Sequence, residues 1–126
     1  MSVTFDAATL TGLRDVGTVR IETSRAPGQP LRAATIWIVV DEADRVLVRS
    51  VRGEQGRWYR DLRANPSGAL GLAGRRLAIR AEPADDPERI ESCSAALSAK
   101  YARAGASLAS MIVEDVLHAT LELRPA

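Results

Sequence analysis

Cysteine and histidine are almost absent from this sequence, which contains one of each, Cys93 and His118. A single cysteine excludes an internal disulfide framework and a cysteine-rich metal cluster. One histidine beside it argues against a structural zinc site. We therefore expect no resident metal ion.

Long apolar runs are lacking too. The longest extends from Ile36 to Val40, whereas a membrane-spanning helix needs about 20 apolar residues. The first fifteen residues hold no basic segment followed by an apolar one, and Asp6 interrupts them, so no signal peptide is predicted. We expect a soluble, cytoplasmic protein with no membrane partner.

The chain is long enough, and apolar enough, to form one compact domain, residues 1–126. Its composition, 46% hydrophobic and 26% charged residues, is typical of globular proteins, and a chain of this length buries roughly two thirds of its unfolded surface. The net charge is +1, so no overall charge attracts the protein to nucleic acid. Nucleic acid is not an expected partner.

The hydrophobic pattern is that of a mainly β protein of the α+β class. Strands, indicated by alternation or β-branched runs, are expected at residues 18–23, 35–41, 45–50, 69–73, 75–83 and 119–123. Helices are expected at residues 7–14, at 57–64, from Pro87 to Gly105, and over part of 107–117. The strands do not alternate with long helices, which disfavours a parallel doubly wound sheet. We expect a small antiparallel barrel or curled sheet with peripheral helices, in which residues 35–50 form a hairpin.

Positive charge is concentrated in one segment. Six arginines, at positions 45, 49, 52, 57, 60 and 63, stand there against two acids, Glu54 and Asp61. On a chain of nearly zero net charge, this excess indicates either a site for an anionic ligand or an arginine-rich face in contact with water. The charge pattern alone leaves both open.

The same segment has the features of a phosphate site. Ser50 to Gly56 is a glycine-containing loop between a strand and a helix, where the N–H groups of a helix N-terminus can hold a phosphate. Arginine adds bidentate donors that suit phosphate oxygens. Trp58 and Tyr59 follow at once, in a chain with only 4% aromatic residues. They favour a planar anionic ligand, although anchoring the helix in the core is an equally good role for Trp58.

Other catalytic patterns are weaker. The sequence contains neither a Walker loop nor a G-x-G-x-x-G fingerprint. A Ser-His-Asp triad through His118 stays open, but no serine lies in an elbow motif, so a structural or surface role fits this histidine better. Cys93 falls on one helix face with Ile90, Leu97 and Tyr101 and is expected to be a core residue.

A family resemblance rests on the order strand, Ser-x-x-Gly loop, Trp-Tyr and Leu-x-Ala-Asn-Pro over residues 45–66. This order resembles the flavin- and deazaflavin-dependent split β-barrel oxidoreductases, of pyridoxamine-phosphate-oxidase-like fold, and among them the deazaflavin-dependent nitroreductases. Residues 23–32, followed by Ile36-Trp37, are similar to the family's motif Gly-Arg-x-Ser-Gly-x-x-Arg-x-x-Pro-Leu. Here Ser24 and Pro27 stand where Gly and Ser are usual, and Arg52 replaces a loop glycine. The resemblance extends over residues 18–123.

The resemblance implies a six-stranded split barrel that forms a homodimer and binds coenzyme F-420, or alternatively FMN, at the subunit interface. Its activity would be hydride transfer to a small organic acceptor. Carried over position by position, the cofactor-binding residues are Arg25 and Arg32 at the phosphate or anionic tail, Ser50, Arg52, Gly53 and Arg57 in the loop over the ribityl phosphate, and Trp58 and Tyr59 at the ring. Tyr59 is the candidate proton donor. The polyglutamate tail of F-420 favours this coenzyme over FMN beside so many arginines.

Two non-enzymatic functions stay open. A protein that holds a flavin-type cofactor or another amphipathic anion without turnover would have the same pocket. An interaction domain with an arginine face for an acidic partner would show a steep salt dependence of binding. Aromatic residues beside the arginines fit a planar anionic ligand better than a duplex.

Overall fold

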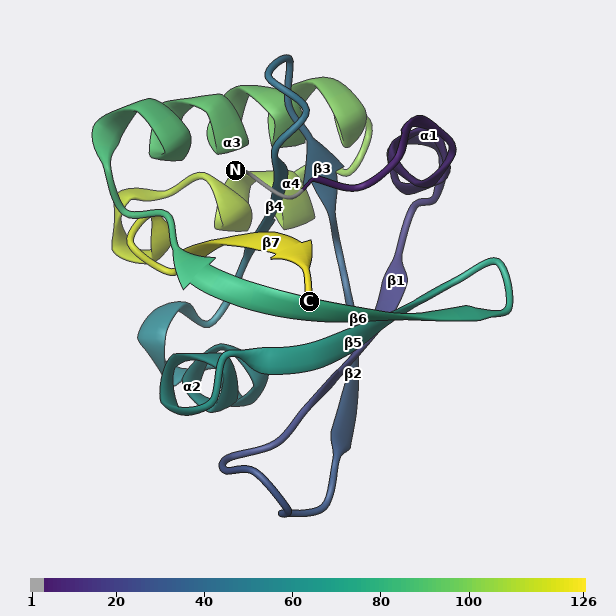
Figure 1. The fold of residues 1–126 in the computed structure, drawn as a ribbon. Helices are drawn as coiled ribbons and strands as arrows, with labels where there is room; N and C mark the ends of the chain where they lie inside the picture. The colour runs from purple at the N-terminus through teal and green to yellow at the C-terminus, as the bar shows by residue number, and fades with distance from the viewer. Residues whose placement is uncertain (1–3) are drawn as a thin grey trace.

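A single antiparallel sheet of seven strands organises the chain, as the computed structural model of residues 4–126 shows (Figure 1). The strands follow one another across the sheet in the order β2-β1-β5-β6-β7-β4-β3. Their bounds are β1 Val19–Thr23, β2 Arg32–Ile36, β3 Val39–Val40, β4 Val46–Arg49, β5 Ser67–Leu72, β6 Arg75–Pro83 and β7 Thr120–Pro125. This is the predicted α+β architecture, a curled half-barrel of antiparallel strands with helices around it.

The sheet curls because one segment supplies both of its edges. β2 pairs with β1, β3 pairs with β4, and only Trp37 and Ile38 separate β2 from β3 along the chain. The expected hairpin is confirmed for β3 and β4, but the expected single strand at 35–41 is divided, which gives seven strands instead of six. Ile38, at the bend, is completely buried, so the bend keeps the apolar run inside while the two edges turn toward each other.

Three of the four helices begin where the sequence predicts, and the fourth begins one residue earlier. Their bounds are α1 Ala7–Asp15, α2 Arg57–Ala64, α3 Pro87–Lys100 and α4 Ala106–Met111, with 3-10 turns η1 at Gly53–Gln55 and η2 at Glu114–Val116. Asp86 caps α3 by accepting a hydrogen bond from the N–H of Arg89 at 3.1 Å, and Pro87 occupies the first helical position. Within residues 4–126, no helix has the length and apolarity that a membrane span requires.

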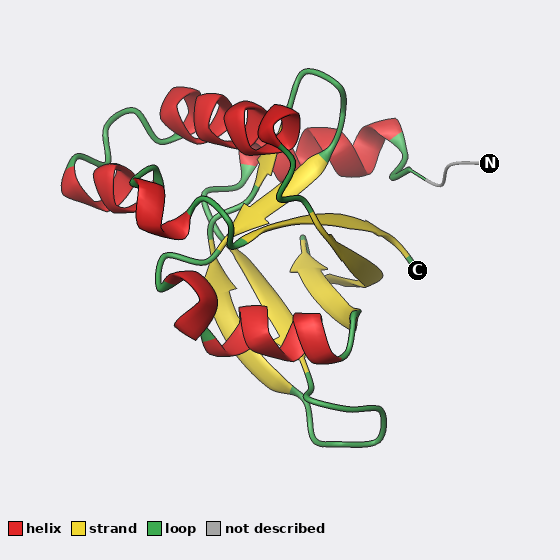
Figure 2. Cartoon of the chain, turned by 90° about the vertical axis from the view of Figure 1, so that its left-hand side faces the viewer, coloured by secondary structure: helices red, strands yellow, loops and turns green. Residues whose placement is uncertain are grey.

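Two apolar clusters hold these elements together. The larger fills the inside of the curled sheet, with completely buried residues such as Leu13, Ile21 and Leu70. The second lies between the β3–β4 hairpin and the helices α3 and α4, and contains Cys93 and Leu97. Figure 2 shows α3 and α4 together on one part of the sheet and α2 apart from them on another. Cys93 is therefore a core residue, as predicted, and burial raises the pKa of its thiol to about 11.

Candidate functional site

The loop that follows β4 is tightly folded. The backbone N–H of Ser50 donates to the carbonyl of Ala119, and the carbonyl of Ser50 accepts from the N–H of Gly53 at 2.9 Å. Gly53 has a φ of +63°, a left-handed conformation that favours glycine. A Cβ at Gly56 would lie 2.1 Å from the Ser50 hydroxyl oxygen, so only glycine fits there without displacing Ser50. The structure thus brings the predicted loop residues Ser50 and Gly53 together at the start of α2.

The N-terminus of α2 has no capping side chain. Its N-cap is Gly56, no side chain accepts from its first N–H groups, and its first turn contains no acidic residue. These N–H groups have no partner within the helix and form, with the helix dipole, a place where an anion is favoured. Arg57 stands at the first helical position and donates to the carbonyl of Ala33 on β2 at 2.9 Å. The donor set fits a phosphate.

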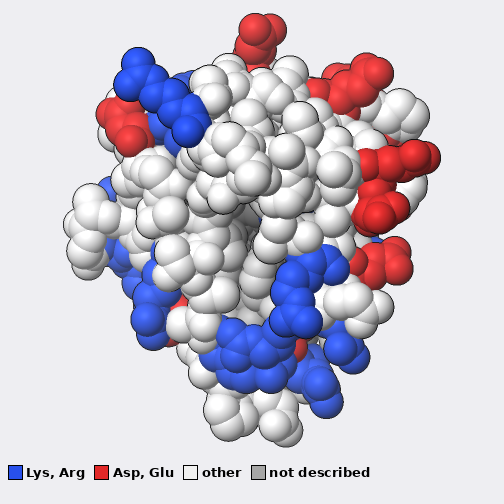
Figure 3. Space-filling model, turned by 180° about the vertical axis from the view of Figure 1, so that it is seen from behind, with Lys and Arg blue, Asp and Glu red and all other residues white. Residues whose placement is uncertain are grey.

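The six arginines of the basic segment do not stay together. Arg45 pairs with Asp41 and Glu88 on the far side of the β3–β4 turn, and Arg49 turns into the interior, where it is 2% exposed. The remaining four are exposed on η1 and α2 and form no salt bridge within residues 4–126: Arg52, Arg57, Arg60 and Arg63. Figure 3 shows basic side chains gathered at the lower end of the molecule, where Figure 1 places α2 and the β1–β2 loop.

The two upstream arginines have different surroundings. Arg25 is exposed on the β1–β2 loop. Arg32, on β2, pairs with the Asp61 carboxylate at 2.5 Å, and the same buried carboxylate accepts from the Thr23 hydroxyl at 2.9 Å. Arg32 therefore ties β2 to α2, and much of its charge is already neutralised within the chain.

The two adjacent aromatic residues, Trp58 and Tyr59, also have different surroundings. Trp58 is half-buried and lines a cavity, whereas Tyr59 is 3% exposed within the large apolar cluster and does not line that cavity. The Tyr59 hydroxyl accepts from Arg63 at 2.9 Å and donates to the carbonyl of His118 at 3.4 Å. This position favours a packing role for Tyr59, and His118 is exposed.

The cavity beside Trp58 has a volume of about 290 Å³ and lies where β2, the end of β4, α2 and α4 meet. Its wall contains both tryptophans of the chain; the lining residues are Thr35, Ile36, Trp37, Arg49, Val51, Trp58, Ser107, Ser110 and Met111. Arg49 and the α4 residues are not among the site residues predicted from the sequence. The one available signal was the spacing on β4, because Arg49 follows the buried Leu47 by two residues and therefore lies on the same face of the strand.

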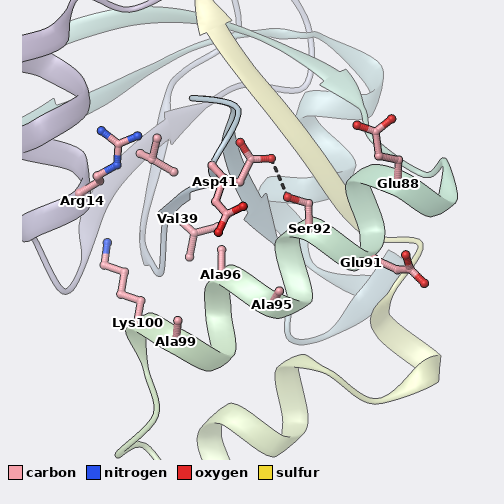
Figure 4. A pocket seen from close by; sticks show the side chains of 12 residues that line it. Arg14, Val39, Asp41, Glu88, Glu91, Ser92, Ala95, Ala96, Ala99 and Lys100 are labelled. Atoms are coloured by element: carbon pink, nitrogen blue, oxygen red, sulfur yellow. Dashed lines mark hydrogen bonds between the residues drawn. The ribbon is translucent and has the colours of Figure 1, made fainter.

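A larger groove of about 720 Å³ lies between α1, β3 and α3 (Figure 4). Burial alone would raise the pKa of Asp41, but hydrogen bonds from Ser92 and Arg45 outweigh it and hold the pKa below its ordinary value. Burial lowers the pKa of Lys100 to about 8, and its ammonium donates to the carbonyls of Leu13 and Ile38. These contacts of Lys100 join α3 to α1 and to the bend between β2 and β3. None of the site residues predicted from the sequence lines this groove.

Solved structures share this architecture. The heme storage protein HutZ from Vibrio cholerae is 15% identical, with a TM-score of 0.68 over 95% of this chain and 89% of HutZ. An F420-H2 dependent reductase, FDR-A, is 15% identical, with a TM-score of 0.62 over 86% of this chain and 94% of the reductase. A third structure, described as a domain-swapped dimer, is 16% identical, with a TM-score of 0.63 over 87% of this chain and 81% of its own. At such identities the similarity establishes the split-barrel fold and leaves the ligand open.

No curated protein matches the sequence significantly. A family model does match it, over residues 9–123, which include every strand and helix of the domain except the first two residues of α1 and the last two of β7. The family is described as "Uncharacterized protein conserved in bacteria (DUF2255)". This split-barrel chain, with its uncapped, arginine-rich helix N-terminus, therefore belongs to the DUF2255 family.

Proposed function

We propose that this protein is a split-barrel oxidoreductase that binds coenzyme F-420 and transfers a hydride to a small organic acceptor, with FMN as the alternative cofactor. One observation carries the proposal. The uncapped N-terminus of α2 adjoins a cavity walled by both tryptophans, and α2 with the loop before it contains four exposed arginines that pair with no carboxylate of residues 4–126. Such a surface suits a ligand that is planar at one end and anionic at the other.

Each part of the surface has a distinct role in this proposal. Arg57 and the free N–H groups of α2 hold the phosphate, and Ser50 and Gly53 keep the loop in place beneath it. Arg52 and Arg25, both exposed, meet the more distant negative charges of the tail. Arg32 acts indirectly, through its bond to Asp61. Trp58 lies against the ring, while the cofactor supplies the hydride chemistry and the protein binds it and excludes water.

The histidine content bears on the choice between a flavin-type cofactor and haem. HutZ is named as a heme storage protein, and haem binding commonly uses a histidine ligand. The one histidine of this chain, His118, does not line the cavity beside Trp58. The F420-H2 dependent reductase shares the fold to a similar degree, and the excess of arginine suits a polyanionic tail. Storage of the same cofactor without turnover is the remaining alternative, which an activity assay separates.

A second copy of the chain completes the cofactor site in this proposal. The cavity, at about 290 Å³, is at the lower limit for ligand sites, so a tricyclic cofactor with its side chain exceeds it. Three of the exposed large apolar residues lie at or beside it: Val51 lines the cavity, and Ile112 and Val113 follow the cavity residue Met111. A domain-swapped dimer occurs among the similar structures. We therefore infer a homodimer whose interface covers this apolar rim.

Replacing Arg57 by alanine is expected to weaken F-420 binding about ten- to a hundredfold, because a hydrogen bond to a charged group contributes roughly 1.5–3 kcal/mol. The melting temperature should change little, since Arg57 is exposed. Fluorescence titrations of the wild-type and variant proteins, with parallel melts, measure both quantities.

Arg75→Ala is the matched control for this experiment. Arg75 is exposed at the β5–β6 turn and forms no salt bridge within the described chain, so its loss removes the same charge away from α2. Equal affinities for the Arg57→Ala and Arg75→Ala variants would place the cofactor phosphate elsewhere.

A further inference from the structure

Arg49 is a buried cation without an acidic partner. Its side chain is 2% exposed, yet no carboxylate of the described residues lies within salt-bridge distance. The other buried charged side chains all have such a partner: Asp41 pairs with Arg45, Asp61 with Arg32, and Glu122 with Arg89 and Arg124. Arg49 is thus the exception among the buried charges of residues 4–126.

The contacts of Arg49 are all to neutral groups. Its Nε donates to the Thr120 hydroxyl at 2.8 Å, and its Nη1 donates to the Ser94 hydroxyl at 2.8 Å and to the carbonyl of Met111 at 3.1 Å. Nη2 donates to the carbonyl of Ile90 at 3.0 Å. A guanidinium has five N–H donors, so these four bonds leave one N–H of Nη2 free.

No neighbouring group neutralises this charge. The nearby thiol of Cys93, with its pKa raised to about 11, stays uncharged, and arginine itself keeps its proton in proteins. Burying an ion without a counter-ion is strongly unfavourable. Hydrogen bonds from Arg49 to neutral acceptors on α3, α4 and β7 offset only a part of this cost, so a bound anion would be favoured beside it.

The cavity of about 290 Å³ gives access to Arg49, which is one of its lining residues. Trp37 and Trp58 supply flat apolar walls, and Trp37 is held by stacking on Tyr101, with 3.9 Å between ring centroids. Ser107 and Ser110 add hydroxyl groups from α4. Aromatic walls with one buried cation suit an organic acid better than an inorganic anion.

We propose that this cavity binds a small aromatic carboxylic acid of one or two rings, with its carboxylate on Arg49 and its ring against Trp37. A single free N–H beside a single charge matches a monoanion, and a volume of about 290 Å³ suits one or two rings. This site is distinct from the phosphate site at the N-terminus of α2. The binding of the acid to this cavity does not rest on the proposed function.

Binding is tested without any cofactor, with 4-nitrobenzoate and its neutral analogue 4-nitrobenzamide as probes. Both tryptophans of the chain line the cavity, so quenching of intrinsic fluorescence reports its occupation. Wild-type protein is expected to bind the acid at least about tenfold more tightly than the amide, as a charge-assisted hydrogen bond predicts. Equal affinities, or no saturable quenching by the acid, would overturn the proposal.

Ser94→Asp is the decisive variant, because it places a carboxylate where the Ser94 hydroxyl now accepts from Arg49. With its charge paired internally, Arg49 should lose the preference for acid over amide, to less than about twofold. Ser94→Asn, of the same size but neutral, should keep the preference. A Ser94→Asp protein that still prefers the acid would contradict the assignment to Arg49.

A second variant keeps the test independent of the folding of Ser94→Asp. Ser110→Phe fills the cavity from α4 and leaves Arg49 unchanged, so it should abolish binding of both probes. Retained binding would place the site elsewhere. Titration of F-420 into the same proteins is a separate measurement, so failure of the acid site and failure of the proposed cofactor are distinguishable.

Discussion

Replacing Asp61 by alanine is expected to lower the free energy of unfolding by about 2 kcal/mol, because a buried carboxylate that accepts two hydrogen bonds is lost, whereas its ion-pair partner Arg32 is partly exposed. The Asp61 carboxylate is 2% exposed and accepts from Thr23 on β1 and Arg32 on β2, so it joins both strands to α2. Without it, the Thr23 hydroxyl loses its acceptor and Arg32 its counter-ion. For a domain of this size the melting temperature should fall by about 8 °C.

Two variants serve as controls for this measurement. Glu54→Ala removes an exposed carboxylate of η1 that has no salt bridge in residues 4–126 and should change stability by less than about 0.5 kcal/mol. Asp61→Asn keeps an acceptor for Thr23 but not the charge, and should lie between wild type and Asp61→Ala. A loss below about 1 kcal/mol for Asp61→Ala would show that α2 is held by its apolar face alone.

Light scattering is expected to give a mass near 27 kDa at micromolar concentration, twice the chain mass of 13.5 kDa. The expected interface is the apolar rim of the cavity, where Val51 and Val113 are 52% and 47% exposed. Closed two-fold symmetry is the commonest arrangement of soluble oligomers. A mass near 13.5 kDa would contradict the homodimer and would leave the tricyclic cofactor without an enclosing site.

Charged substitutions locate the interface. Val113→Glu should shift the protein toward monomer and weaken cofactor binding with it, because a charge is placed in an apolar contact. Leu31→Glu is the matched control, since Leu31 is also exposed, at 50%, but lies on the β1–β2 loop. If Leu31→Glu dissociates the dimer and Val113→Glu does not, the subunits meet at the other end of the sheet.

Local signals made most of the fold predictable. The Asp86-Pro87 pair marks the start of α3 through its own capping chemistry, and the strand at 75–83 was predicted with the bounds of β6. The division of residues 35–41 at Trp37 and Ile38 was not predictable in this way. An apolar run has the same pattern whether it pairs with one strand along its whole length or pairs first with β1 and then with β4. The division therefore depends on strands that are distant in the sequence.

The candidate site was predictable where its residues are close in sequence. Ser50, Gly53 and Arg57 meet because one loop and one helix start bring them together. Trp58 and Tyr59 separate because consecutive helical residues point about 100° apart, so the two rings face different surroundings. Arg49 is only one of six arginines in the basic segment as far as the sequence shows, since charge along the sequence does not reveal which face of β4 a residue occupies or which helix covers it.

Titration of wild-type protein with F-420, FMN and haemin, side by side and at one ionic strength, tests the central claim most directly. We predict that F-420 binds with a dissociation constant below about 100 µM, an affinity of about −5.5 kcal/mol, and more tightly than FMN or haemin. Tighter binding of FMN would select the alternative cofactor. If neither F-420 nor FMN binds below that concentration, or if haemin binds in preference to both, the proposed function is contradicted although the split-barrel fold stands.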